Sequence, residues 1–289
     1  MTTATSSPAK TRMRRSRIKL TPVRGLIGLV LAALAVLVVF PLVWMAISGF
    51  KTNAELYGDP WGLPGEWRWH NYERAYEYGV IHYIGNSLVV TIGSIILVVL
   101  VSSFAAFALV RVKIPFSAPL TMLVLGGLML SETVALVPLF RIMRGIGLYN
   151  SLFGIIILYT AFRVPFITFL IRAYMLGLPQ EVYDSAVVDG CNTWQIFWRI
   201  TMPLCYPIII SAAVLQALFS WNEFVFALVF IKDDELKTMP VGLMTLQSKL
   251  TTDWPVVFAG LTMSAIPMVL AFLFGQRYFV KGITEGMGK

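Results

Sequence analysis

The side chains that can do chemistry are few in this chain, and their spacing argues against an enzyme. The two histidines, His70 and His82, and the two cysteines, Cys191 and Cys205, lie in different segments. They assemble neither a nucleophile with a base beside it nor a set of metal ligands. No segment carries the GxxxxGK[ST] pattern with which a glycine-rich loop holds nucleotide phosphates. We therefore expect no catalytic residue, no metal site and no cofactor in this chain.

Three ionisable residues, Glu132, Arg163 and Glu223, stand inside long apolar segments. A charge in such a segment is costly and is often functional. With a rise of 1.5 Å per helical residue, Glu132 and Arg163 lie at heights that differ by about 7 Å, which an arginine side chain can span. We predict that these two residues form an ion pair, with a structural role preferred to contact with a cargo.

A stripe of small and polar residues accompanies Glu223 at helical spacing. Its members are Ala213, Gln216, Ser220, Glu223 and Ala227. Close packing against another helix is the main interpretation, because small residues let membrane helices approach each other. The alternative is that Gln216, Ser220 and Glu223 line the path of a cargo, and we add Tyr159 and Arg163 to this candidate path.

The most informative polar segment between the apolar blocks is 179–203. Pro179 suits the first turn of a helix, and Gly190 suits the end of that helix. Asn192, followed three residues later by Gln195, has the pattern of a capping box, so we predict a second short helix there. Two short helices joined by a glycine turn are well placed to contact another molecule.

The second of these short helices carries large apolar side chains, at Trp194, Ile196, Phe197 and Ile200. We expect that lipid cannot cover all of them, since the segment lies between two spans. An uncovered apolar surface at this place indicates a protein partner. A segment that only connects two spans is the simpler alternative.

The composition predicts a protein that crosses a membrane several times. Hydrophobic residues make up 57% of the chain and charged residues only 13%, whereas soluble domains are about 25% charged. The apolar residues fall into six blocks with the length of roughly 20 residues that a helix needs to cross the hydrocarbon. These blocks are 26–47, 87–110, 118–139, 152–171, 204–230 and 256–274. We expect an all-α fold with six transmembrane helices, the first one retained rather than cleaved.

The basic residues predict the orientation of the chain. Seven of them, Lys10, Arg12, Arg14, Arg15, Arg17, Lys19 and Arg24, precede the first span. The positive-inside rule then places both termini in the cytoplasm, together with the 179–203 loop. We expect residues 1–24 to be a disordered basic segment, residues 25–289 to form one transmembrane domain, and residues 275–289 to be its cytoplasmic tail. The net charge of +8 thus indicates orientation rather than nucleic-acid binding.

The 179–203 loop resembles the EAA motif of bacterial ABC importer permeases, which is written E-A-A-x3-G-x9-I-x-L-P. Its seven defined positions are occupied, at the correct spacing, by Asp184, Ser185, Ala186, Gly190, Ile200, Met202 and Pro203. The chain has Asp for Glu, Ser for Ala and Met for Leu at three of these positions. The shortened acid is the departure that bears most on function, because it places the carboxylate one methylene closer to the backbone.

Other segments resemble the carbohydrate-importing branch of these permeases, and in particular the six-span subunit of maltose-type systems. The resemblance runs from about residue 20 to the end of the chain. Its further residues are Lys51, Asn71, Tyr72, Asp189 with Gly190, Trp221, Asn222, Glu223 and Phe224, and the ending Gln276, Arg277, Lys281, Gly282 and Thr284.

This resemblance implies a permease subunit in a bacterial or archaeal plasma membrane. Its partners would be a second permease in a heterodimer, two ATPase subunits that bind ATP and Mg²⁺, and an extracytoplasmic solute-binding protein. The short helix of the loop would be a coupling helix in a cleft of the ATPase. Asp184 would pair there with a basic residue, Gly190 would form the turn, and the segment from Trp194 to Ile200, with Phe197, would fill the cleft.

The cargo implied by the resemblance is a mono- or oligosaccharide. A solute-binding protein would dock on the 231–255 loop, and the tail from Lys281 would reach the ATPase. Glycerol phosphate, an amino acid or a peptide is the alternative cargo for the same kind of permease. An ion-coupled secondary transporter is a further alternative, and it would need no ATPase.

Overall fold

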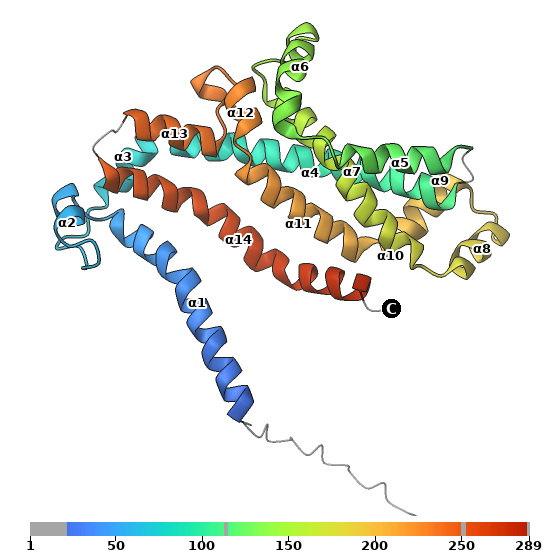
Figure 1. Ribbon diagram of the computed structural model, residues 1–289, viewed down its shortest axis with the longest axis horizontal. Helices are drawn as coiled ribbons and strands as arrows, with labels where there is room; N and C mark the ends of the chain where they lie inside the picture. Colours follow the sequence, from blue (N-terminus) through green and yellow to red (C-terminus); the bar gives the residue numbers. More distant parts are fainter. Residues whose placement is uncertain (1–21, 113–114, 250–252, 288–289) are drawn as a thin grey trace, which may run out of the picture. The chain divides into compact units, whose positions relative to one another are not determined.

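The computed structural model describes residues 22–112, 115–249 and 253–287 (Figure 1). Most of the expected basic N-terminal segment, and the side chains of the 275–289 tail, lie outside the described residues. Every regular element in the described ranges is helical, which confirms the predicted all-α fold. The elements are α1 Pro22–Ser48, α2 Asn53–Gly58, α3 His70–Glu77, α4 Val80–Arg111, α5 Ser117–Gly127, α6 Glu132–Gly145, α7 Leu152–Leu176, α8 Gln180–Val188, α9 Thr193–Ile196, the π-helical η1 Phe197–Thr201, α10 Met202–Leu204, α11 Tyr206–Asn222, α12 Val225–Phe230, the 3₁₀-helical η2 Asp234–Leu236, α13 Met239–Lys249 and α14 Trp254–Met287.

The chain divides into two units, one up to Trp44 and one from Met45 onward. Most of α1 belongs to the first unit. Its stretch Gly25–Ser48 is long and apolar enough to cross a membrane. Large apolar side chains are exposed all round this helix, as expected of a surface that is covered by lipid or protein in a membrane.

Four helices, α4, α7, α11 and α14, make up the body of the second unit (Figure 1). The α4 helix packs along α7, and α11 packs against both α4 and α14. Gly93 lies at the contact between α4 and α7, where a Cβ atom would lie 2.7 Å from Ile156 Cδ1. Single helices long enough to span the membrane number four in the described residues, and bent helix pairs bring the total to as many as six.

The third predicted span is not one helix. The segment predicted as 118–139 forms α5 and α6, which meet at an angle of 101°. Gly127 ends α5 directly beside α7, where a Cβ atom would lie 2.7 Å from Pro165 Cγ. The prediction of a continuous helix is wrong here. The apolar sequence continues between α5 and α6, but the helix is interrupted there.

The fifth predicted span, 204–230, is also broken. Residue Cys205 separates α10 from α11, and Glu223 and Phe224 separate α11 from α12. Glu223 has extended backbone angles, φ −68° and ψ 130°. The single helix predicted for this segment is therefore wrong as well, and the second break begins at the buried Glu223.

A compact segment between α1 and α4 is built around Lys51 and Asn71. Lys51 is buried, and its Nζ donates hydrogen bonds to the carbonyls of Asp59 and Pro60, at 3.2 and 2.9 Å. Asn71 Nδ2 donates to the carbonyls of Gly49 and Lys51, both at 2.9 Å. These two residues, which are part of the family resemblance, therefore shape this segment through backbone contacts.

A capping box begins α2 in the same segment. Thr52 Oγ1 accepts a hydrogen bond from the Glu55 amide, and Glu55 accepts one from the Thr52 amide at 2.7 Å. Glu55 also accepts a hydrogen bond from the Gly65 amide at 3.0 Å. The bonds from the Thr52 and Gly65 amides hold the pKa of the Glu55 carboxyl below its ordinary value.

Candidate functional site

The loop between α7 and α11 has the two short helices that its sequence predicts. The first, α8, is followed by Gly190 at φ +78°, a left-handed conformation that favours glycine. The second, α9, begins with the predicted capping box, in which the Asn192 and Gln195 side chains each accept the other residue's amide at 2.8 and 2.9 Å. Both local predictions are confirmed.

The helix then changes its winding. Phe197–Thr201 is π-helical, and it leads through α10 and Cys205 into α11. Helices with an extra residue in a turn are often found at functional sites. The helical segment from Thr193 to Leu204 meets α11 at Cys205, with an angle of 75° between the two.

The residues at the EAA positions differ in exposure. Asp184 and Ser185 lie on the exposed face of α8, whereas Ala186 is buried. Asp184 Oδ1 accepts a hydrogen bond from Gln180 Nε2 at 3.0 Å. Gly190 and Pro203 are exposed and Ile200 is half-buried. The exposed face of α8 thus presents the Asp184 carboxylate.

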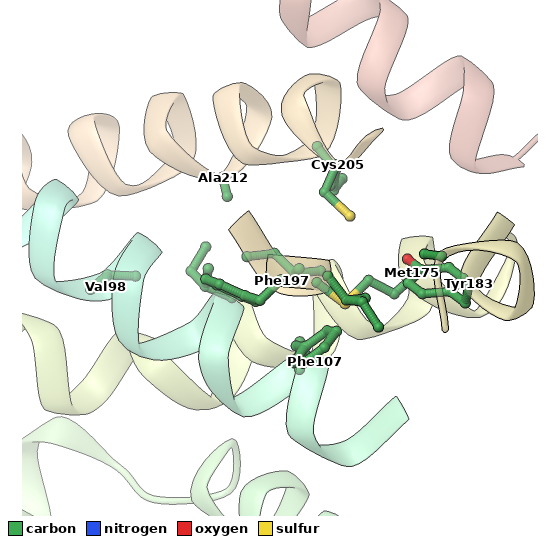
Figure 2. Close-up of a cluster of buried hydrophobic side chains, with 13 residues drawn as sticks. Val98, Phe107, Met175, Tyr183, Phe197, Cys205 and Ala212 are labelled. Carbon is green, nitrogen blue, oxygen red and sulfur yellow. The ribbon is translucent and has the colours of Figure 1, made fainter. Parts of the chain in front are cut away.

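The expectation of an uncovered apolar helix is wrong for Ile196 and Phe197. Phe197 is only 1% exposed, and Figure 2 shows it between Phe107 of α4 and Ala212 of α11. Its ring stacks on Phe104 of α4, with centroids 4.4 Å apart. Phe197 is therefore a core residue of this chain and offers no surface to a partner in this structure.

What remains exposed on the loop is a smaller surface. Trp194 is 62% exposed, with one ring face stacked on Phe104, and Val188 is 86% exposed. We call this the loop surface. It consists of Val187, Val188, Trp194 and Trp198, with Asp184, Asp189 and Arg199 among its exposed charged neighbours.

Arg111 fixes the loop to the spans, a contact that the sequence analysis did not anticipate. Its guanidinium donates hydrogen bonds to the carbonyls of Met175 and Leu178, both at 3.1 Å, and to the side chain of Gln180. It also lies 3.7 Å above the ring centre of Tyr183. The only signal in the sequence is its position as the charged residue that ends an apolar block. Through Arg111, the ends of α4 and α7 are joined to the start of α8.

The embedded charges pair as predicted. Arg163 Nη2 lies 3.7 Å from Glu132 Oε1, which confirms the pair. The guanidinium carbon also lies 3.2 Å above the centre of the Phe219 ring. Arg163 is thus engaged on both sides by groups of this chain.

The stripe on the fifth span packs inside the chain. Gln216, Ser220 and Glu223 are all buried, and so is Tyr159 of α7. The hydroxyls of Ser94 and Ser220 lie 3.2 Å apart, which joins α4 to α11. These four residues are thus buried within this chain, whereas Arg163 is about a third exposed. The assignment of a cargo path to them stays a prediction.

Straight helices and bent helix pairs of membrane-spanning length, with the α8–α9 loop attached at one end, define this chain as a multi-span membrane protein (Figure 1). Residues 114–285 match the family described as "Binding-protein-dependent transport system inner membrane component". The chain belongs to this family, which consists of membrane permease subunits of ABC transporters that are not themselves catalytic. The predicted resemblance to ABC importer permeases is confirmed.

Several curated proteins are similar over most of this chain. The probable ABC transporter permease protein YurM of Bacillus subtilis is 41% identical over 252 residues, which cover 87% of this chain and 84% of that protein. The arabinooligosaccharides transport system permease protein AraQ of Halalkalibacterium halodurans is 33% identical over 88% of this chain and 92% of that protein. The diacetylchitobiose uptake system permease protein NgcG of Streptomyces coelicolor is 29% identical over 87% of this chain and 84% of that protein.

A solved structure has the same fold. It is the crystal structure of a bacterial ABC transporter involved in the import of the acidic polysaccharide alginate. One of its chains superposes with a TM-score of 0.76 and 22% identity, over 90% of this chain and 99% of that chain. At this identity the likeness concerns the fold, which agrees with the predicted permease architecture.

Proposed function

We propose that this chain is the permease subunit of an ATP-driven importer of a sugar that is delivered by a solute-binding protein. The observation that carries the proposal is the loop surface, an exposed patch of tryptophan and valine side chains between two spans of a binding-protein-dependent permease. Names of the similar proteins AraQ and NgcG, which refer to oligosaccharides and to diacetylchitobiose, support a sugar as the cargo.

In this proposal the loop surface seats against ATPase subunits that bind ATP and Mg²⁺. Trp194 and Val188 supply apolar area for the contact, and Asp184 supplies a carboxylate for a basic residue of the ATPase. Arg111 ties the loop to α4 and α7. Movement of the ATPase would therefore reach the spans without loss in a flexible joint.

The pairing of Arg163 favours an uncharged cargo over a phosphate ester. An anion at membrane depth needs a cation that is free to receive it. Arg163, the cation within the apolar block 152–171, already faces Glu132 and Phe219. A sugar needs no such counter-charge.

The remaining parts of the proposal follow from topology. Residues 1–24 would be a basic cytoplasmic segment, residues 25–289 the transmembrane domain, and both termini would be cytoplasmic. A second permease would complete the translocation pore. The solute-binding protein would dock on the 231–255 loop, where residues 232–235 are exposed.

Uptake by the reconstituted transporter tests this proposal. The chain is assembled in proteoliposomes with the permease, ATPase and binding protein encoded beside it, and labelled oligosaccharides, glycerol phosphate, amino acids and peptides are offered in turn. We expect uptake of a mono- or oligosaccharide that stops when the ATPase carries an inactivating substitution. Uptake of only a non-sugar, or uptake that survives the inactive ATPase, would overturn the proposal.

A further inference from the structure

Both broken spans are attached to the same helix, by residues one turn apart. Tyr159 Oη of α7 donates a hydrogen bond to Glu223 Oε2 at 2.5 Å. Four residues further along α7, Arg163 pairs with Glu132 at 3.7 Å. Glu132 is the first residue of α6, and Glu223 directly follows the last residue of α11. Each carboxylate therefore stands at the break of its span.

Glu223 does more than accept the phenol. Its Oε1 accepts a hydrogen bond from the Phe226 amide at 2.8 Å, and its Oε2 accepts one from the Ala227 amide at 3.3 Å. These amides lie in the first turn of α12, where a helix has no acceptors of its own. Phe226 and Ala227 are fully buried, so these amides need a partner from the chain itself. The buried Glu223 carboxylate thus caps the first turn of α12 and also accepts the hydrogen bond from the Tyr159 hydroxyl.

The two contacts of α7 belong to one cluster. The Phe219 ring of α11 lies beneath the Arg163 guanidinium, at 3.2 Å, and meets the Tyr159 ring edge-on, with centroids 5.8 Å apart. The positions of Tyr159 and Arg163 are therefore not independent, because both pack on the same aromatic ring.

The half-spans beyond the breaks pack against each other. Phe140 of α6 lies 6.3 Å from Phe230 of α12, measured between ring centroids. Leu136 and Leu139 of α6 join the same apolar cluster. Asn150, just before α7, accepts hydrogen bonds from the Lys232 and Asp233 amides at 2.9 and 3.0 Å, which holds the far end of α12.

We propose that Tyr159 and Arg163 are positioning residues for transport, which hold α6 and α12 to α7 so that the two half-spans move as one body. Tyr159 acts through Glu223, and Arg163 acts through Glu132. Neither residue contacts a cargo in this role. The transport test of this proposal rests on the proposed function. The attachment of α6 and α12 to α7 can be tested without it.

A distance measurement tests the structural part in the full chain. Val134 of α6 and Leu228 of α12 are exposed, so each can be replaced by a spin-labelled cysteine after Cys191 and Cys205 are changed to serine. We expect one narrow distance distribution, and a clearly broader one in Tyr159→Phe, which removes only the hydroxyl. A distribution in Tyr159→Phe as narrow as in the parent chain would overturn the proposal.

Tyr83→Phe is the matched control for this measurement. Tyr83 is a buried tyrosine of α4 whose hydroxyl makes no hydrogen bond among the described residues. We expect Tyr83→Phe to leave the distance distribution unchanged, and equal broadening in both variants would contradict the proposal. Glu223→Gln provides a second variant if Tyr159→Phe does not fold, because its amide oxygen can still accept the Phe226 amide. It is expected to broaden the distribution too, and a narrow one would count against the proposal.

Transport kinetics test the second part. A hydrogen bond to a charged group corresponds to about a tenfold effect or more, so we expect Tyr159→Phe to lower the maximal uptake rate by about tenfold. The half-saturating cargo concentration should stay the same, whereas a cargo contact would raise it. A raised half-saturating concentration with an unchanged maximal rate would overturn the positioning role. If the parent transporter imports no sugar, the proposed function fails, and the spin-label distances still decide the positioning of α6 and α12.

Discussion

Arg163 Nη2 lies 3.7 Å from Glu132 Oε1, and this ion pair joins the middle of α7 to the first turn of α6. About a third of each side chain is exposed, so the pair sits at the edge of the packed helices rather than in their centre. It holds one half of a broken span against a continuous one. The pair accounts for two of the three charges in the apolar segments without assigning either of them to cargo.

A double-mutant cycle measures this pairing. Arg163→Ala alone leaves the partly exposed Glu132 without its cation, so we expect it to lower the stability of the assembled transporter. In a Glu132→Gln background the same change should be tolerated better, with a coupling of about 1 kcal/mol for a pair that solvent partly screens. Thermal unfolding of the four proteins gives the coupling. Equal effects of Arg163→Ala in both backgrounds would show that the two residues are independent.

The sequence predicts features that follow from local spacing, and it also predicts one contact between two helices. The capping box of Asn192 and Gln195 follows from their spacing, and the turn at Gly190 follows from the conformational freedom of glycine. The Glu132 and Arg163 pair follows from their heights along two helices and from the cost of an unpaired charge in an apolar segment. The all-α fold follows from hydropathy.

The sequence does not predict what depends on contacts between distant segments. Phe197 is buried because Phe104 and Phe107, about ninety residues earlier in the chain, lie against it. The break before α12 depends on a carboxylate that can cap it, and hydropathy does not register that Glu223 has this role. Gly126 and Gly127 precede the break between α5 and α6. They are a local signal for this break that a hydropathy pattern does not detect.

Phe197 and Trp194 are expected to respond differently to truncation, although both are aromatic residues of the same loop. Phe197→Ala removes a ring from the core, and we expect a loss of about 3–5 kcal/mol of stability. Trp194→Ala removes a largely exposed ring, so it should leave the Tm nearly unchanged and weaken binding to the ATPase.

Thermal unfolding of the permease and co-purification of the ATPase separate these two effects. The interpretation of Phe197 as a core residue would be contradicted by a stable Phe197→Ala permease. That of Trp194 as a contact residue would be contradicted by normal ATPase co-purification in Trp194→Ala.

The capping box at α2 predicts a pH dependence of stability. The pKa of Glu55 is lower in the folded chain, so the carboxylate stabilises the fold above its unfolded pKa of about 4.3. This contribution is lost as the pH falls through the lower folded pKa. We expect the Tm difference between the parent chain and Glu55→Gln to be constant near neutral pH and to close in acid.

Glu66→Gln is the control for this pH dependence, since Glu66 is an exposed carboxylate of the same segment and caps no helix. We expect the Tm of Glu66→Gln to fall in acid as much as the Tm of the parent chain. A Tm gap between the parent chain and Glu55→Gln that persists unchanged in acid would mean that the Glu55 charge does not stabilise the cap.

We propose above that ATP-driven movement enters this subunit through the loop between α7 and α11, and two glycines allow this to be tested. Gly190 and Gly147 have similar left-handed φ angles, +78° and +73°, and open space around the position of a Cβ atom. Valine at either position therefore causes a similar backbone strain of about 1–3 kcal/mol, without a clash. Only Gly190 lies in the loop; Gly147 follows α6.

The measurement is ATPase co-purification and ATP-driven uptake for the two valine variants side by side. We predict that both insert into the membrane, and that Gly190→Val loses at least about tenfold in ATPase association, the factor that about 1.4 kcal/mol corresponds to. Uptake should fall with it, while Gly147→Val keeps both. Normal association and uptake in Gly190→Val, or an equal loss in Gly147→Val, would contradict the account.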